Sequence, residues 1–221
     1  MMQEQWTKVD ELLGSLLVPD DEALENALKT SQQAGLPPIQ VSPVQGKLLN
    51  LLARSIKARR ILEIGTLGAY STIWLARALH AGGRLITLEF EPLHAKVAQA
   101  NIRTAALDPV VDLRVGPALE TLPVLVSEQA GPFDLIFIDA DKVNTPAYFQ
   151  WSLKLSRPGS IIIVDNVVRK GAIADPSSED PAVQAMQQFL SMLAAEPRVS
   201  ATALQMVGGK GYDGFALALV L

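Results

Sequence analysis

Short apolar runs alternate with longer stretches of helical periodicity through the middle of the chain. The apolar runs predict buried strands over residues 60–65, 84–90, 111–115, 133–139 and 160–165. The stretches between them predict helices over residues 69–81, 92–106, 118–128 and 144–156. Strands and helices in regular alternation predict a mostly parallel sheet with right-handed crossovers. The strands are almost continuously apolar, which is typical of a sheet covered by helices on both faces.

The two ends of the chain follow other patterns. Residues 3–36 predict two amphipathic helices, and we interpret this region as a packing or dimer arm. A third helix follows, with Ser42 as its N-cap and Pro43 in its first turn. A helix over residues 182–195 then precedes two strands, 199–207 and 215–221. Their spacing predicts an antiparallel pair at the end of a doubly wound α/β sheet of the Rossmann-like kind.

Composition narrows the range of partners. The chain has 221 residues, a net charge of −4 and no cysteine, so it has no disulfide and no thiolate metal site. The acidic balance argues against nucleic acid as the main partner, because phosphate binding needs a basic face. No apolar run reaches the ~18 residues that a membrane span requires, and we expect no membrane partner. Since the first residues lack the basic-then-apolar pattern of a secretion signal, we expect a cytoplasmic protein.

A glycine turn follows the first predicted strand of the sheet. Gly65 and Gly68 form only part of the G-x-G-x-x-G fingerprint of dinucleotide sites. Glu63, just before the turn, would repel a pyrophosphate but attract a cation. Glu89, at the end of the next strand, is placed to accept hydrogen bonds from a ribose diol. Together these residues predict a ribosylated ligand that lacks phosphates, and the sulfonium S-adenosylmethionine fits. Alternatively, Glu63 caps a local turn and Glu89 is a solvated charge.

A second polar cluster follows two later strands. Asp139, Asp141 and Lys142 stand at the carboxyl end of one strand, and Asp165 and Asn166 end the next. If the first strand continues, alternation places Asp139 and Asp141 on the same side. If those strands are neighbours, three oxygen ligands converge at the edge of the sheet where open α/β sheets bind ligands. Oxygen ligands favour Mg²⁺, or Mn²⁺ or Ca²⁺, over zinc. The alternative is that these residues only cap turns and a helix.

Other charged residues near this cluster have less certain roles. A dication beside Lys142 would favour its neutral amine through like-charge repulsion, so we interpret Lys142 as a general base, whereas an exposed lysine is the default. We interpret His80 and His94 as surface residues. Arg169 and Lys170 either meet an acidic group on a substrate or are solvated loop charges.

At these residues the sequence resembles the cation-dependent O-methyltransferases, the group of caffeoyl-CoA and catechol O-methyltransferases with their bacterial relatives. The resemblance rests on Leu62-Glu-Ile-Gly65-Thr, Tyr70-Ser71, Glu89, Gly116-Pro-Ala118, Phe137-Ile-Asp139-Ala-Asp-Lys142 and Val164-Asp165-Asn166. It implies a seven-stranded class I methyltransferase fold with an antiparallel last strand. It also implies an N-terminal helical arm over residues 1–40, an S-adenosylmethionine-dependent methyltransferase domain over residues 41–221, and a homodimer.

The resemblance further implies a divalent-metal-dependent O-methyltransferase that acts on a small phenolic or catechol acceptor with vicinal hydroxyls. The implied positions for S-adenosylmethionine are Val41, Glu63, Gly65, Thr66, Ser71, Glu89, Ala118, Asp139 and Asp141. The implied metal ligands are Asp139, Asp165 and Asn166, and the implied catalytic residues are Lys142 and Asp139.

Three features depart from the family pattern. The stretch after Lys142 reads Val143-Asn144-Thr145 where the family commonly has Asp-Asn-Tyr, and Tyr148 is displaced. Ala69 stands where the family usually has glycine, and Arg169 lies in the loop that often carries a tryptophan against the acceptor. Two other functions stay open at this point. One is a nicotinamide dehydrogenase of similar fold, against which the incomplete glycine fingerprint and Glu63 argue. The other is a non-catalytic or differently specific Rossmann-like nucleotide-binding protein that kept the fold.

Overall fold

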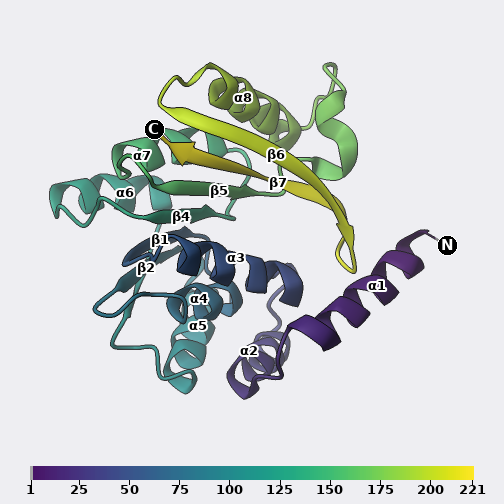
Figure 1. Cartoon of the computed structure of the whole chain (residues 1–221), viewed down its shortest axis with the longest axis vertical. Helices are drawn as coiled ribbons and strands as arrows, with labels where there is room; N and C mark the ends of the chain where they lie inside the picture. Colours follow the sequence, from purple (N-terminus) through teal and green to yellow (C-terminus); the bar gives the residue numbers. More distant parts are fainter. Residues whose placement is uncertain (1) are drawn as a thin grey trace.

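Seven strands form one sheet in the order β3-β2-β1-β4-β5-β7-β6 in the computed structural model, which describes residues 2–221 (Figure 1). The strands are β1 Arg60–Ile64, β2 Arg84–Glu89, β3 Val111–Val115, β4 Leu135–Ile138, β5 Ile161–Asp165, β6 Val199–Gly208 and β7 Gly211–Val220. The helices are α1 Met2–Leu17, α2 Glu22–Gln33, α3 Pro43–Ser55, α4 Tyr70–Ala76, α5 Pro92–Thr104, α6 Ala118–Ser127, α7 Thr145–Lys154 and α8 Pro181–Ala195, with a 3-10 helix over Arg169–Ala174. None of these helices has the length and apolar character needed to cross a bilayer.

The strand directions confirm the predicted doubly wound fold. Strands β1 to β5 are parallel, and β7 runs antiparallel between β5 and β6. The chain leaves β1 towards β2 and β3 and then returns to β4 on the other side of β1. The order therefore reverses between β1 and β4. In open α/β sheets this reversal leaves a crevice at the carboxyl ends of the strands.

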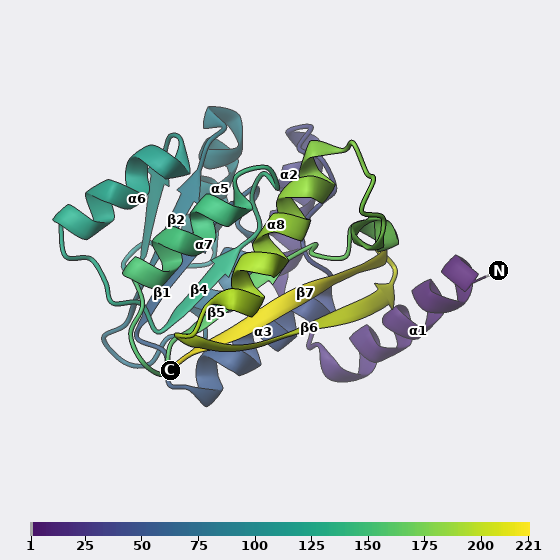
Figure 2. The same ribbon diagram turned by 90° about the horizontal axis from the view of Figure 1, so that it is seen from above.

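Helices cover both faces of the sheet, as the apolar strands predict (Figure 2). On one face, α6, α7 and α8 bury a core in which Phe149 and Phe189 meet edge to face at 5.3 Å between ring centroids. On the other face, α2, α3 and α4 pack around Ile73 and Trp74. Because side chains alternate along a strand, successive residues of β1 point to opposite faces. Thus Leu62 and Ile64 belong to the first core, whereas Ile61 belongs to the second.

Two predicted boundaries are wrong. Helix α4 ends at Ala76 instead of residue 81, because the backbone turns there and the His80 amide donates to the Ala58 carbonyl at 2.8 Å. Strand β7 begins at Gly211 instead of residue 215, because Gly211 already pairs with Gly208 across a tight hairpin. The glycine-rich segment between the predicted strands is thus mostly strand.

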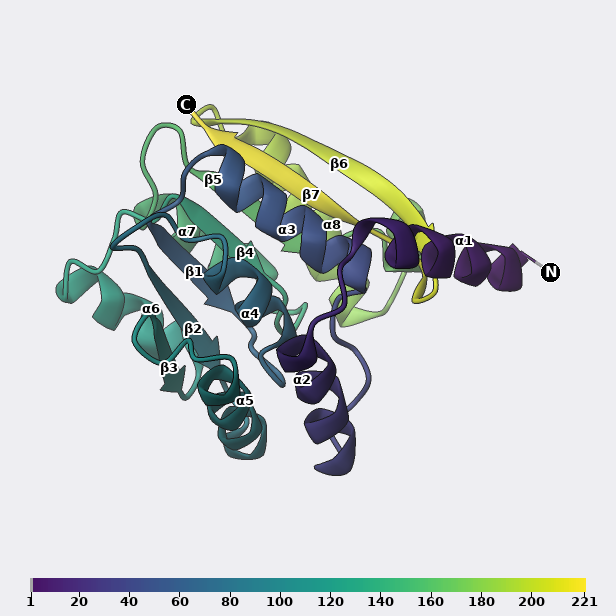
Figure 3. The ribbon, with the colours of Figure 1, turned by 60° about the horizontal axis from the view of Figure 1, so that its bottom comes forward.

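Helix α1 projects from the body of the molecule towards the β6–β7 hairpin (Figure 3). Gln3 donates to the Gly208 carbonyl at 2.9 Å, and Asp10 accepts from the Gly209 amide at 2.8 Å. None of the residues of α1 is buried, and the side chain of Leu16 is 70% exposed. By contrast, α2 buries apolar residues in the second core.

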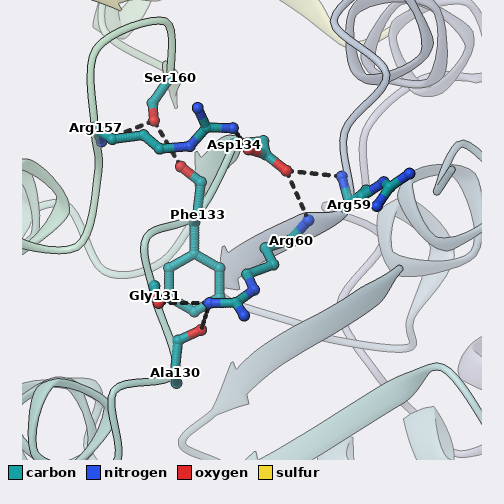
Figure 4. Close-up of polar contacts among 8 residues, drawn as sticks. All are labelled: Arg59, Arg60, Ala130, Gly131, Phe133, Asp134, Arg157 and Ser160. Carbon is teal, nitrogen blue, oxygen red and sulfur yellow. Dashed lines mark hydrogen bonds and ion pairs between the residues drawn. The ribbon is translucent and has the colours of Figure 1, made fainter. Parts of the chain in front are cut away.

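A polar bracket joins β1, β4 and β5 at their amino ends (Figure 4). Asp134 accepts hydrogen bonds from the backbone amides of Arg59 at 2.7 Å and Arg60 at 2.9 Å, and it pairs with the guanidinium of Arg157. Ser160 donates to the Phe133 carbonyl at 2.7 Å. Because the strands are parallel, this bracket lies at the edge of the sheet opposite their carboxyl ends.

Candidate functional site

A cavity of about 700 Å³ opens at the carboxyl ends of β1, β2 and β4, where the strand order reverses. Most of the site residues predicted from the sequence line it: Val41, Gly65, Thr66, Ser71, Glu89, Ala118, Asp139, Asp141, Lys142 and Asn166. Glu63 and Asp165 do not line this cavity and lie behind or beside it. The volume and position are those of a small-molecule site in a doubly wound fold.

Gly65 brings two strand ends into close contact. Its φ is +99°, and a Cβ built on it would lie 2.2 Å from the carbonyl oxygen of Asp139. Only glycine fits here, because a side chain would meet backbone. Ala69, which stands in place of the family's glycine, adopts the left-handed conformation with φ at +67° just before α4. The turn therefore keeps the backbone form that a glycine would give it.

Glu63 is fully buried behind the glycine turn. It points to the face of α4 and accepts hydrogen bonds from Ser71 at 2.6 Å, Thr87 at 2.7 Å and the Thr72 hydroxyl. Burial raises the pKa of Glu63 to about 7, although the three hydroxyl hydrogen bonds oppose this and the charge of Asp139 adds to it. Glu63 holds the first turn of α4 against β1 and β2. Its contact with a cofactor stays a prediction.

Glu89 orders the loop that follows Gly65. One carboxylate oxygen accepts from the amides of Thr66 at 3.1 Å and Leu67 at 2.7 Å, and the other accepts from the Glu91 amide at 2.9 Å. His94 Nδ1 lies 3.5 Å from this second oxygen. The interpretation of His94 as a surface residue is wrong, because its side chain is only 22% exposed and lines the cavity. Only its position in the first turn of α5, next to Glu89, could have indicated this.

The two acidic strand ends meet as the sequence predicted. Ile138 of β4 and Val164 of β5 are register partners, so Asp139 and Asp165 follow at neighbouring positions. Asp165 is buried, and its backbone leads to Asn166, whose φ is +58°. Burial and the charge of Asp139 raise the pKa of Asp165 above its ordinary value. Two acids held this close fit a bound dication, which would offset their repulsion.

Lys142 completes this group. Its ammonium donates to Asp139 at 2.7 Å, and its side chain is only 13% exposed, so the default of an exposed lysine does not hold. Within residues 2–221, no group of three or more His, Cys, Asp or Glu side chains could hold a metal ion. The third protein ligand that the family resemblance implies beside Asp139 and Asp165 is the amide oxygen of Asn166. That donor set suits a hard ion such as Mg²⁺.

Asp141 has a different setting from the one its spacing suggested. Strand β4 ends at Ile138, so the alternation does not continue as far as Asp141. Asp141 instead accepts hydrogen bonds from Asn144 Nδ2 at 2.7 Å and from the Tyr148 hydroxyl. Burial raises the pKa of the Tyr148 hydroxyl, and the hydrogen bond to the Asp141 carboxylate raises it further. Asp141 thus lies on the cavity wall and anchors the start of α7.

A second cavity, of about 340 Å³, lies beside the first, between α3, the end of β5 and the β6–β7 hairpin. Asn166 lines both cavities, and Asp165 lines the second. There Gln45 donates to Asp165 at 2.8 Å, a contact that sequence reasoning missed. Asp165 and Asn166 therefore separate the two spaces.

The neighbouring residues Arg169 and Lys170 line different cavities. Arg169 lines the first cavity, and its Nε atom is buried without a hydrogen-bond partner in the described part of the chain. Lys170 is exposed and lines the second cavity. The interpretation as a solvated loop charge therefore suits Lys170 but not Arg169.

Known proteins resemble this chain along its whole length. The family described as O-methyltransferase matches residues 15–219. The catechol O-methyltransferase of Niastella koreensis is 54% identical over 220 residues, which cover 100% of both chains. An O-methyltransferase of Bacillus cereus, solved with SAH, has a TM-score of 0.98, 56% identity and full coverage of both chains. The O-methyltransferase TomG of Streptomyces achromogenes, solved with SAM, has a TM-score of 0.96, 52% identity and coverage of 100% and 99%.

Proposed function

The chain belongs to the O-methyltransferase family, and on that premise we propose that it moves a methyl group from S-adenosylmethionine to one hydroxyl of a small catechol. One observation carries the choice of acceptor. Asp139 and the Asp165–Asn166 pair end neighbouring strands, beside a cavity that Lys142 also lines. Such a site can hold a dication and two adjacent oxygens. The name of the Niastella koreensis relative points to the same acceptor.

The first cavity supplies the features that the methyl donor needs. Gly65 lines the cavity wall and lets the ends of β1 and β4 lie close together, and the carboxylate of Glu89 lies on the wall for a ribose diol. Val41 and Ala118 add apolar contacts to its lining. Asp139 places negative charge near a sulfonium. The dehydrogenase alternative lacks such support, since its fingerprint is incomplete and the family is that of methyltransferases.

Asp139, Asp165 and Asn166 would hold the divalent ion, with Mg²⁺ first and Mn²⁺ or Ca²⁺ as alternatives. When bound, such an ion would supply a positive charge that favours the ionised form of an acceptor hydroxyl. Lys142, held beside Asp139 and in the neutral-amine form that a neighbouring dication favours, would accept that proton. The acceptor oxygen then gains the methyl group and the donor becomes a thioether. Much of the rate enhancement comes from holding the two reactants in line.

We also propose a homodimer. The apolar residues of α1, among them Leu12, Leu13 and Leu16, are exposed along a helix that projects from the body. A contiguous apolar surface of this kind is typical of an interaction site. A second copy of the chain would cover it.

The test of the proposed function is methyl transfer from labelled S-adenosylmethionine to a panel of catechols, with and without excess EDTA. We expect transfer to one hydroxyl, its loss in EDTA and its recovery when Mg²⁺ is restored. Full activity in EDTA would remove the ion from the reaction. Binding of S-adenosylmethionine without turnover on any diol would favour the non-catalytic alternative.

A further inference from the structure

Gln45 lies outside every motif that carries the family resemblance, yet it touches a predicted metal ligand. Its side-chain amide donates to Asp165 Oδ2 at 2.8 Å, between segments 120 positions apart in the chain. We propose that Gln45 is a positioning residue that fixes the Asp165 carboxylate for the divalent ion. This inference rests on the metal-dependent function proposed above.

The backbone that carries Gln45 is held firmly. The backbone amide of Gln45 donates to the N-cap hydroxyl of Ser42 at 3.3 Å, so Gln45 lies in the first turn of α3. The next residue, Gly46, packs against α4 so tightly that a Cβ would lie 2.4 Å from the Trp74 ring. A side chain on such a helix start has little freedom to withdraw. The amide is therefore presented to Asp165 from a rigid support, as a precise ligand site needs.

Asp165 depends on this contact for its orientation. It is 4% exposed, so solvent cannot replace a lost partner freely. Its Oδ1 accepts from the Asn166 amide at 2.8 Å, while Oδ2 receives the Gln45 amide. Each carboxylate oxygen keeps a further lone pair for a ligand. Both oxygens are thus fixed in direction while the group stays able to bind a cation.

The chemistry of an amide suits this task. A lysine or arginine here would repel a dication, and another carboxylate would repel Asp165 itself. A neutral donor orients the ligand without adding charge to the site. Hydrogen-bond partners of this kind affect metal affinity by about 10- to 100-fold when they are removed.

The experiment measures Mn²⁺ binding to the cofactor-free protein by the electron paramagnetic resonance signal of free Mn²⁺. The test variant is Gln45→Met, which keeps the length of the side chain but removes the donor. The matched control is Gln99→Met, which breaks a Gln–Asp hydrogen bond of 3.1 Å to Asp108, and neither of these residues lines either cavity. We expect the Mn²⁺ Kd to rise about 10- to 100-fold in Gln45→Met and to stay unchanged in Gln99→Met. The Kd for SAH, measured by calorimetry, should not change in either variant.

Two outcomes would overturn the inference, and they differ. If the unchanged protein binds Mn²⁺ and Gln45→Met binds it within about twofold, Gln45 has no positioning role, and the proposed function stands. If the unchanged protein binds no Mn²⁺, the metal site fails together with the inference. Should Gln45→Met not fold, Gln45→Asn gives the same test, because its shorter amide falls short of Asp165.

Discussion

Gly65 and Asp139 lie against each other across the point where the strand order reverses, with the Asp139 carbonyl oxygen 2.2 Å from the place a Cβ on Gly65 would take. The Asp139 amide also donates to the Ile64 carbonyl at 2.9 Å. The glycine turn after β1 and the end of β4 are thus fixed relative to each other through backbone. A change at either residue is expected to affect both sites.

Gly65→Ala should therefore do more harm than its left-handed φ alone explains. The control is Gly159→Ala, since Gly159 has a φ of +89° but nothing within 4 Å of its Cβ position. Forcing alanine into that conformation costs about 1–2 kcal/mol. Urea unfolding should show that loss for Gly159→Ala and a larger one for Gly65→Ala, together with weaker SAH binding. Equal losses in the two variants would show that the strand ends can move apart.

Glu63→Gln should change the dependence of stability on pH. The folded protein holds the pKa of Glu63 at about 7, above the ordinary 4.5, so folding takes up a proton between these values. Wild-type stability contributed by Glu63 is therefore present below pH 4.5 and lost as the pH rises through 7. Each pH unit in this range is worth ~1.4 kcal/mol, so the amide variant should gain on the order of 3 kcal/mol on wild type between about pH 4.5 and pH 8. A constant difference between the two proteins would contradict this.

Asp134→Asn should change the dependence of stability on pH in the direction opposite to that of Glu63→Gln. Burial favours a higher pKa for Asp134, but the amides of Arg59 and Arg60 and the charge of Arg157 outweigh it and lower the pKa. The stability that this carboxylate contributes is present above its ordinary pKa and is lost as the pH falls through the lowered value. The deficit of Asp134→Asn should thus be greatest near neutral pH and shrink in acid. SAH binding should not change, because Asp134 precedes β4 at the amino ends of the strands, opposite the cavity at their carboxyl ends.

The sheet and the acidic strand ends could be predicted because they depend on local patterns. Apolar runs give the strands, and the carboxyl ends of parallel strands meet at one edge, which brings Asp139 and Asp165 together. The site contacts that the sequence did not predict depend on how helices pack against the sheet. The contact of His94 with Glu89 depends on how α5 is rotated about its axis. The contact of the Gln45 amide with Asp165 depends on how α3 packs against the sheet. The place of His94 in the first turn of α5 is a local signal for its contact, whereas no local spacing indicates the contact of Gln45, which lies 120 positions from Asp165.

Asp141 illustrates the same limit at shorter range. Its spacing from Asp139 fits strand alternation, but β4 ends before it reaches Asp141. Asp141 instead accepts a hydrogen bond from the hydroxyl of Tyr148 in α7. A strand ends where its backbone pairing stops, and the neighbouring strands determine that point. The position of Ala69 is a contrasting case, since the surrounding structure imposes a left-handed conformation that alanine disfavours.

Lys142→Met should separate chemistry from binding. It keeps the bulk of the side chain but removes the amine that lies 2.7 Å from Asp139. Loss of a positioned general base typically lowers the rate about 10²- to 10⁴-fold, so kcat should fall by that factor. The Kd for SAH should stay close to that of wild type. A kcat that is unchanged, measured with saturating Mg²⁺, would assign the proton to another group.

A charge on α1 should dissociate the proposed dimer. Leu12→Glu combined with Leu16→Glu places two carboxylates on the exposed apolar side of the helix. The control is Val126→Glu on α6, where the valine is 44% exposed on a distant helix. Analytical ultracentrifugation should find a dimer for wild type and the control, and a monomer for the α1 variant. A wild-type monomer at all concentrations would refute the dimer.

Arg169→Gln should alter the choice among acceptors. Arg169 stands in the cavity wall with a buried Nε that has no partner in the described chain, so an anionic group on the acceptor would satisfy it. A hydrogen bond to a charged group contributes about 1.5–3 kcal/mol, which corresponds to roughly 10- to 100-fold in kcat/KM. We expect that loss with a carboxylated catechol such as dihydroxybenzoate. Unsubstituted catechol should be methylated as well by the variant as by wild type.

The control for this change is Lys170→Gln, which removes the neighbouring but exposed charge and should leave both acceptors unaffected. The KM for S-adenosylmethionine distinguishes the other source of a carboxylate, the methionine part of the donor. If Arg169→Gln raises that KM and lowers kcat/KM equally for both catechols, Arg169 binds the donor. Selectivity that changes only between the two acceptors, with the donor KM constant, places the acidic end of the acceptor beside Arg169, because only that acceptor loses a charged partner.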